Sequence, residues 1–222
     1  MSEIIWTQVD DYLNERLIGP DAALNEALST SESAGLPAIA VSACQGRMLE
    51  LLARTAGARR ILEVGTLGGY STIFLARALP TDGRLITLEL NPRHAEVARR
   101  NVDAAGVGGL VEIRVGAALE LLQELERQGG PLFDLSFIDA DKVNAPQYFD
   151  AALRMSRAGA TIVVDNVVRK GALLDEDSTD ENVRGMRRLI ERVRDEKRVR
   201  TTVVQTVGAK GYDGFLMAVV LG

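Results

Sequence analysis

The stretch Ile61-Leu62-Glu63-Val64-Gly65-Thr66-Leu67-Gly68-Gly69-Tyr70-Ser71 decides how the rest of the chain is interpreted. Its apolar start predicts a buried strand, its glycines predict a tight turn, and Ser71 opens the pattern of a helix. Glycines let a backbone approach a ligand closely, and the N-terminus of a helix presents free N–H donors. The stretch is therefore typical of a site for a nucleotide-type cofactor.

The spacing of the glycines separates this turn from the dinucleotide-binding fingerprint. Gly65, Gly68 and Gly69 do not form the pattern G-x-G-x-x-G, and an acidic residue, Glu63, stands before the turn. A carboxylate in that place would repel a pyrophosphate, whereas it can approach a cationic or amino-bearing ligand. The motif therefore favours a cofactor without a pyrophosphate.

The composition is that of an ordinary globular protein. The 222 residues are 46% apolar and 26% charged, and a net charge of −5 argues against a protein that holds nucleic acid or an anionic membrane. Cys44 is the only cysteine, which excludes an internal disulfide and favours a reducing compartment. We recognise no signal peptide and no apolar run of membrane-spanning length. We therefore expect a single cytoplasmic domain over residues 1–222.

From residue 60 onward, short apolar runs alternate with helical patterns. The apolar runs are residues 60–64, 84–88, 111–115, 133–138 and 161–164. The helical patterns between them are residues 70–79, 92–105, 117–127 and 145–156. This alternation predicts a parallel sheet with helices on both faces.

The C-terminal part of the chain departs from this pattern. A charged helix is predicted near residues 180–196, and two apolar runs follow it, at 198–206 and 214–221. The glycine-containing turn between these runs predicts a hairpin whose last strand is antiparallel to the others. The acidic segment 166–181 is predicted to form a mobile loop beside the site.

The N-terminal part is predicted to be helical. Within an extension over residues 1–35, two short helices are expected to be broken at Gly19-Pro20, with a loop over 29–37. A further helix is predicted over 42–56, and its inward-facing side chains are expected to be Met48, Leu49, Leu51 and Leu52.

Parallel sheets bind ligands at the carboxyl ends of their strands, so the residues that follow each apolar run are the candidates. Glu89 ends the second run, where a carboxylate can accept both hydroxyls of a ribose. The weaker interpretation of Glu89 is a charge that stabilises the N-terminus of the next helix. Ala117-Ala118 follows the third run, and such small side chains leave room for a flat adenine.

Two aspartates and an asparagine follow the fourth and fifth runs, as Asp139 and then Asp165-Asn166. Carboxylate and amide oxygens are ligands that suit Mg²⁺. Either aspartate alone would be interpreted as a helix cap or turn residue. Together with Asn166, on strands expected to be neighbours, they favour a metal site. Lys142 could approach a hydroxyl there and accept its proton, although a solvated surface lysine is the simpler interpretation.

Together these residues resemble the cation-dependent, S-adenosylmethionine-dependent O-methyltransferases, which include the catechol and caffeoyl-CoA enzymes and bacterial relatives. Residues 62–71 resemble the first cofactor motif, residues 137–142 the metal and catalytic-lysine motif, and residues 164–166 the second metal motif. The resemblance covers about residues 36–222. It implies a Rossmann-like class I methyltransferase fold with a seven-stranded, mostly parallel sheet, an antiparallel last strand and helices on both faces.

The resemblance also implies roles for individual residues. Glu63, Gly65 and Ser71 would contact the methionine portion of S-adenosylmethionine. Glu89 would contact its ribose. The further cofactor contacts that the resemblance implies are Val41, Ser42, Thr66, Ala117, Ala118 and Asp139. Ala118 stands where the family often has a hydroxyl, so a hydrogen bond to adenine would be missing or would come from backbone.

For the chemical step, the resemblance implies that Mg²⁺ or another divalent cation is held by Asp139, Asp165 and Asn166. Asp139 and Lys142 would be the catalytic residues, with Lys142 as general base. The implied reaction is methyl transfer to a phenolic hydroxyl of a catechol-like small molecule. The resemblance further implies a homodimer.

Four alternatives remain open. In a metal-independent small-molecule methyltransferase the aspartates would be merely structural. A nicotinamide-dependent oxidoreductase is disfavoured by the glycine spacing, and a non-catalytic adenosyl-binding regulator by the intact metal set. Methylation of nucleic acid is disfavoured because the basic run 184–200 also contains acidic residues. His94, the only histidine, is interpreted as a surface or capping residue.

Overall fold

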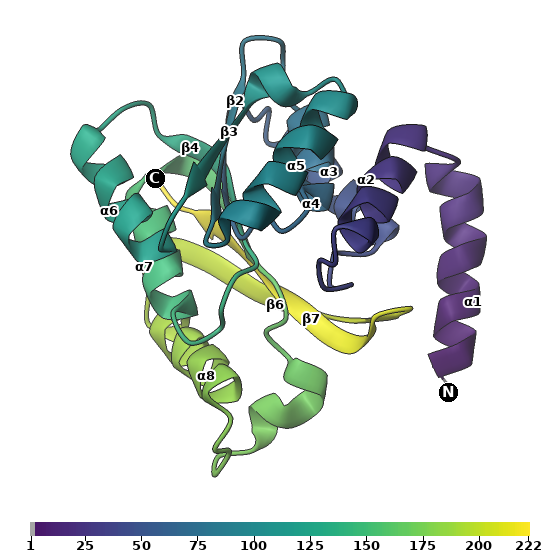
Figure 1. The fold of residues 1–222 in the computed structure, drawn as a ribbon. Coiled ribbons are helices and arrows are strands. Elements are labelled where there is room, and N and C mark those ends of the chain that lie inside the picture. The colour runs from purple at the N-terminus through teal and green to yellow at the C-terminus, as the bar shows by residue number, and fades with distance from the viewer. Residues whose placement is uncertain (1–2) are drawn as a thin grey trace.

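A seven-stranded sheet lies at the centre of the computed structural model, which describes residues 3–222 (Figure 1). Met1 and Ser2, which begin the predicted N-terminal extension, lie outside the described residues. The strand order is β3-β2-β1-β4-β5-β7-β6, and β7 runs antiparallel to both of its neighbours. The strands are β1 (Arg60–Val64), β2 (Arg84–Glu89), β3 (Val111–Val115), β4 (Phe133–Ile138), β5 (Ser156–Val164), β6 (Val199–Gly208) and β7 (Gly211–Val220). The predicted mostly parallel sheet with an antiparallel last strand is confirmed.

Helices cover both faces of the sheet (Figure 1). On one face lie α3 (Ala43–Thr55), α4 (Tyr70–Arg77) and α5 (Pro92–Ala104). On the other face lie α6 (Ala118–Gln128), α7 (Ala145–Arg154) and α8 (Glu181–Arg194). Side chains of a strand alternate between the two faces, so Leu62 packs into the α6–α8 core and Ile61 into the α3–α5 core. The apolar run of β1 is therefore buried on both sides.

One predicted core residue of α3 is placed differently. Leu49 is fully buried, but Leu51 is 55% exposed, so the expectation that both face inward is wrong for Leu51. Two residues along an α-helix are separated by about 200° of rotation, which turns Leu51 away from the side that carries Leu49.

The N-terminal extension contains α1 (Glu3–Leu13), a π-helical turn η1 (Asn14–Ile18) and α2 (Ala22–Ser33). The predicted break at Gly19-Pro20 is confirmed, whereas the predicted loop over 29–37 begins later because α2 continues to Ser33. Helix α1 lies at the outside of the molecule and contains no buried residue (Figure 1). It contacts the β6–β7 hairpin, where the backbone N–H of Ala209 donates to Oδ2 of Asp10 at 2.7 Å.

Two short 3-10 helices complete the fold, η2 (Gly108–Leu110) and η3 (Arg169–Leu174). The second lies within the segment 166–181, so part of that predicted loop is regular. Across residues 3–222 we find no helix that combines the length and the apolar character needed to cross a membrane. The cytoplasmic location stays a prediction.

Candidate active site

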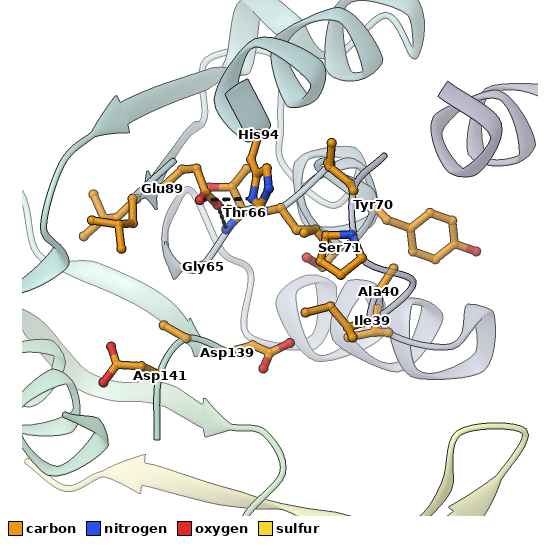
Figure 2. A pocket seen from close by; sticks show the side chains of 18 of the residues that line it. Ile39, Ala40, Gly65, Thr66, Tyr70, Ser71, Glu89, His94, Asp139 and Asp141 are labelled. Carbon is orange, nitrogen blue, oxygen red and sulfur yellow. Dashed lines mark hydrogen bonds and ion pairs between the residues drawn. The ribbon is translucent and has the colours of Figure 1, made fainter. Parts of the chain in front are cut away.

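A cavity of about 940 Å³ opens at the carboxyl ends of the parallel strands, where sheets of this topology bind ligands. Figure 2 shows Glu89 and His94 on one side of the cavity, with Asp139 and Asp141 across from them. Most of the predicted site residues line it, namely Val41, Gly65, Thr66, Ser71, Glu89, Ala117, Ala118, Asp139, Lys142 and Asn166. The sheet thus brings residues from five strand ends to one cavity.

Three predicted residues lie behind the wall of this cavity. Ser42 caps α3, with its hydroxyl accepting from the backbone N–H of Gln45 at 3.2 Å. Glu63 is fully buried and Asp165 is 4% exposed. None of the three lines the cavity directly, and their roles at a cofactor or metal stay predictions.

Glu63 acts on the cavity through Ser71. Its carboxylate accepts a hydrogen bond from the Ser71 hydroxyl at 2.7 Å and another from the Thr72 hydroxyl at 2.5 Å. Burial raises the pKa of the Glu63 carboxyl to about 7, because the charged form is poorly solvated in the core. Glu63 thus orients a serine at the first turn of α4 that does line the cavity.

Gly65 occupies a position where any side chain would force the neighbouring backbone to shift. Its φ is +97°, and a Cβ added there would lie 2.2 Å from the backbone carbonyl oxygen of Asp139. The absence of a side chain therefore lets the turn after β1 pack directly on the turn after β4. This contact joins the predicted cofactor motif to the predicted metal motif.

Glu89 holds the glycine turn in place from the end of β2. One of its oxygens, Oε2, accepts from the backbone N–H groups of Thr66 at 3.2 Å and Leu67 at 2.8 Å. The other, Oε1, accepts from the N–H of Asn91 at 2.9 Å. Leu67 has a positive φ of 51°, which these hydrogen bonds support. Because a carboxylate has about four lone-pair sites, this geometry leaves Glu89 little capacity for two ribose hydroxyls.

His94 lines the cavity beside Glu89, which the sequence interpretation as a surface or capping residue missed. Its Nδ1 lies 3.5 Å from Oε1 of Glu89 (Figure 2). Its position in the first turn of α5, directly after β2, could have identified it as a site residue, because this turn starts at the carboxyl edge of the sheet. His94 is thus a second polar group on the wall where the ribose was predicted.

On the opposite side, Asp139 and Lys142 form an ion pair, with Lys142 Nζ 2.7 Å from Asp139 Oδ1. Lys142 is 8% exposed, so it is not the solvated surface lysine of the simpler interpretation. The neighbouring Asp165 accepts from the side-chain amide of Gln45 at 2.7 Å and from the backbone N–H of Asn166 at 2.8 Å. No local sequence pattern identifies Gln45, which lies 120 residues earlier in the chain.

The acidic groups here are crowded. Burial, and next the negative charge of Asp139, raise the pKa of Asp165 to about 6. Over the described residues 3–222, no group of three or more His, Cys, Asp and Glu residues is arranged to hold a metal ion. A metal at this place would therefore depend on two carboxylates, the Asn166 amide and water.

Asp141 lines the cavity in a fixed position. It accepts from the backbone N–H of Asn144 at 3.0 Å, from the Asn144 side-chain amide at 2.8 Å and from the Tyr148 hydroxyl. Burial and this acceptor raise the pKa of Tyr148 well above its usual range, so the tyrosine stays a donor. The loop between β4 and α7 is thereby held rigidly beside Asp139.

Comparison with known proteins gives consistent matches. A family model described as O-methyltransferase matches residues 21–218. The catechol O-methyltransferase of Niastella koreensis is 49% identical, over 99% of this chain and 100% of that protein. The structure of the O-methyltransferase from Bacillus cereus in complex with SAH has a TM-score of 0.97 and 51% identity, covering 99% of this chain and 100% of that one. The structure of the O-methyltransferase TomG from Streptomyces achromogenes in complex with SAM has a TM-score of 0.97 and 50% identity, covering 100% of both chains.

Proposed function

The chain belongs to the O-methyltransferase family, and on this premise we propose that it methylates a phenolic hydroxyl of a catechol-type small molecule with the help of a divalent cation. S-adenosylmethionine is the methyl donor of this family fold. The observation that carries the proposal is that the glycine turn and the Asp139–Lys142 pair line one cavity. The catechol name of the Niastella koreensis relative supports the acceptor class. The nicotinamide-dependent oxidoreductase is the alternative that the family membership disfavours.

We assign the donor to the side of the cavity formed by the turns after β1, β2 and β3. Ser71 and the backbone at Gly65 and Thr66 would bind the methionine portion, and Glu63 would orient Ser71. Glu89 retains capacity on Oε1 for a ribose hydroxyl. Ala117 and Ala118 have small side chains, which would leave room for adenine.

The residues on the other side fit a divalent cation. Asp139 and Asn166 line the cavity, and the buried Asp165 directly precedes Asn166, so together they offer three hard oxygen donors. Burial, and next the negative charge of Asp139, raise the pKa of Asp165, and a cation would relieve the second of these causes. A divalent cation supplies positive charge that lowers the pKa of an acceptor hydroxyl and fixes its orientation.

Lys142 would accept the proton of the acceptor hydroxyl. It is nearly buried and is held at Asp139, so its Nζ stays at the cavity and does not extend into solvent. Positioning by the rigid β4–α7 loop would contribute as well, because transfer between two held reactants avoids a large loss of entropy. The chemistry of the activated methyl group belongs to the donor itself.

One observation favours the metal-independent alternative. Both carboxylates already have partners, Asp139 in Lys142 and Asp165 in Gln45. In that alternative, Lys142 alone would deprotonate the acceptor and the aspartates would only hold the site together.

The test is methyl transfer from S-adenosylmethionine to a panel of catechols, first with Mg²⁺ and then with excess EDTA. We expect activity that disappears with EDTA and returns with Mg²⁺. Activity that ignores EDTA would select the metal-independent alternative. The Lys142→Met variant should bind S-adenosylhomocysteine normally while its turnover falls about 100-fold or more. Undiminished turnover in this variant would contradict the base assignment.

We also propose that the chain forms a homodimer through α1. This helix contains no buried residue, and its apolar side chains Ile4, Ile5, Val9 and Tyr12 are between 44% and 69% exposed. Ile5, Val9 and Tyr12 are spaced four and three residues apart and so lie on one face of the helix, and exposed apolar surface of this kind is typical of association sites. Light scattering after size exclusion should give a dimer for the natural chain and a monomer for Ile5→Glu/Val9→Glu. Leu132→Glu, which changes an exposed leucine elsewhere, is the control and should stay dimeric.

A further inference from the structure

Arg169 lines the cavity and has no partner for its charge. Within residues 3–222 its guanidinium makes no hydrogen bond or ion pair, and its Nε is buried without an acceptor. The other lysine or arginine of the cavity wall, Lys142, is paired with Asp139 at 2.7 Å. A buried donor without an acceptor costs free energy. Of the described lysine and arginine side chains that line the cavity, Arg169 is therefore the one available to bind a ligand.

The backbone that carries Arg169 is strained. Asn166, Arg169 and Lys170 have φ values of 57°, 54° and 56°, in the left-handed region that residues other than glycine seldom adopt. Such residues persist where the surrounding structure over-determines them, and they cluster at ligand sites. Here the strain falls on the segment that joins β5 to the cavity wall.

Asp213, at the start of β7, holds this strained segment from outside. Its Oδ1 accepts from the backbone N–H groups of Val168 at 3.0 Å and Arg169 at 2.9 Å. The N–H of Val167 donates to the carbonyl of Gly214 at 2.9 Å. These bonds fix the Arg169 backbone against the sheet, so its side chain is presented to the cavity from a rigid support.

Asp180, whose pKa is affected by the charge of Arg169, does not neutralise Arg169. The positive charge of Arg169 contributes to a lowered pKa of Asp180, but the main cause of that lowering is the hydrogen bond from the backbone N–H of Asn182, at 2.8 Å. Asp180 forms no ion pair with Arg169 among the described residues and serves as the N-cap of α8. The guanidinium thus keeps its five donors for another acceptor.

We propose that Arg169 binds a carboxylate on the methyl acceptor, so that the acceptors of this site are catechols that carry an acidic group. The inference rests on the proposed function and names its substrate class. A guanidinium forms two parallel hydrogen bonds with a carboxylate, which fixes orientation as well as charge. Arg169 follows β5, three residues after Asn166, and so lies on the acceptor side of the cavity, away from the turns assigned to the donor.

The test compares 3,4-dihydroxybenzoate with its methyl ester, which differ in charge and share the catechol ring. Both kcat/KM and the affinity of each compound for the protein with Mg²⁺ and S-adenosylhomocysteine would be measured, the affinity by calorimetry. For the natural chain we expect a preference for the acid of about 10- to 100-fold, as a hydrogen-bonded charge pair gives.

Arg169→Gln should remove this preference, and Arg169→Lys, which keeps the charge and loses the fork, should reduce it partly. Lys170→Gln is the matched control, because Lys170 is the exposed neighbour with a similar φ and does not line the cavity. It should keep the acid preference of the natural chain. Melting temperature and S-adenosylhomocysteine affinity of the Arg169 variants check that the fold and the donor site persist.

Equal use of acid and ester by the natural chain, or an acid preference that survives in Arg169→Gln, would overturn the proposal. The second result would assign the carboxylate to another group, such as the cation. A weakened affinity of Arg169→Gln for S-adenosylhomocysteine would overturn it too, because it would place Arg169 at the donor. If neither compound is methylated, the panel of catechols still tests the proposed function, and the calorimetry decides the role of Arg169 separately. Acid binding that Arg169→Gln abolishes supports the role, and absent or unselective binding overturns it.

Discussion

The glycine turn after β1 and the segment after β5 both line the cavity, but the residues that hold them lie at different distances along the chain. Glu63 holds the hydroxyls of Ser71 and Thr72, close by in the chain, and Glu89 holds the backbone of the turn from the next strand. The segment after β5 depends on Asp213, which lies more than forty residues later. The donor side is therefore built mainly from its own motif, and the acceptor side from distant residues. We expect changes in the first to damage the fold and changes in the second to alter the acceptor.

The largest expected effect is that of Gly65→Ala. The new Cβ would meet the Asp139 carbonyl oxygen at 2.2 Å, and the φ of +97° disfavours any side chain. Overpacking and backbone strain together should cost about 4 kcal/mol of the free energy of unfolding. Thermal unfolding should show a melting temperature lowered by about 10 °C, with loss of donor binding.

Gly171→Ala is the matched control on the acceptor side. Its φ is +89°, but the nearest atom to the new Cβ is 3.8 Å away, on Tyr212. Only the strain of the left-handed backbone remains, so the loss should be about 1 kcal/mol. Equal losses in the two variants would mean that the contact between the turns after β1 and β4 contributes nothing.

The next effect concerns Glu63 and pH. Its folded pKa of about 7 lies above the ordinary value of 4.5, so the folded state binds the proton more tightly than the unfolded state. The resulting stability is complete below pH 4.5 and is lost as the pH rises through 7. Between pH 5.5 and 7.5, the contribution of Glu63 should fall by about 2 kcal/mol.

The measurement is urea unfolding at both pH values for the natural chain and for Glu63→Gln, with EDTA in all samples. The variant should lack this share of the pH dependence, because an amide does not titrate. The same slope in both proteins would show that other groups cause it.

A smaller effect is expected for Asp213→Ala. It removes the acceptor of the Val168 and Arg169 N–H groups and should cost about 1.5 kcal/mol of stability. The KM for the acceptor should rise while the affinity for S-adenosylhomocysteine stays the same, as calorimetry and steady-state kinetics would show. Asp213→Asn keeps one acceptor oxygen and should lose less. A weakened donor affinity in either variant would remove the distinction between the two sides.

The smallest effect is expected for Lys210→Ala at the tip of the β6–β7 hairpin. Lys210 Nζ donates to the carbonyl of Ala38 at 3.2 Å, and this exposed bond ties the hairpin to the cavity-lining segment before α3. Exposed polar contacts contribute little, so the free energy of unfolding should change by less than about 0.5 kcal/mol. Lys197→Ala, at an exposed lysine just before β6 and away from the hairpin tip, is the control. A loss above about 1 kcal/mol would contradict the small contribution assigned to this contact.

Local patterns allowed much of the site to be predicted. The glycine turn, Glu89 and Asp139 each directly follow an apolar run, and a parallel sheet brings such positions to one edge. The same rule could have identified His94, because the first turn of α5 begins at that edge. Their individual roles stay predictions, since the structure tests only their placement.

The sequence by itself determined the order of strands and helices along the chain, the antiparallel last strand and the donor motif. These follow from short-range periodicity and turn chemistry, which depend on residues a few positions apart. Only the tertiary structure brought the Gln45 amide to Asp165 and buried Glu63 against the Ser71 hydroxyl. It also brought the backbone N–H of Arg169 to the carboxylate of Asp213. Such contacts join residues that the chain itself separates, and no local pattern records which of many polar side chains will meet across a packed core.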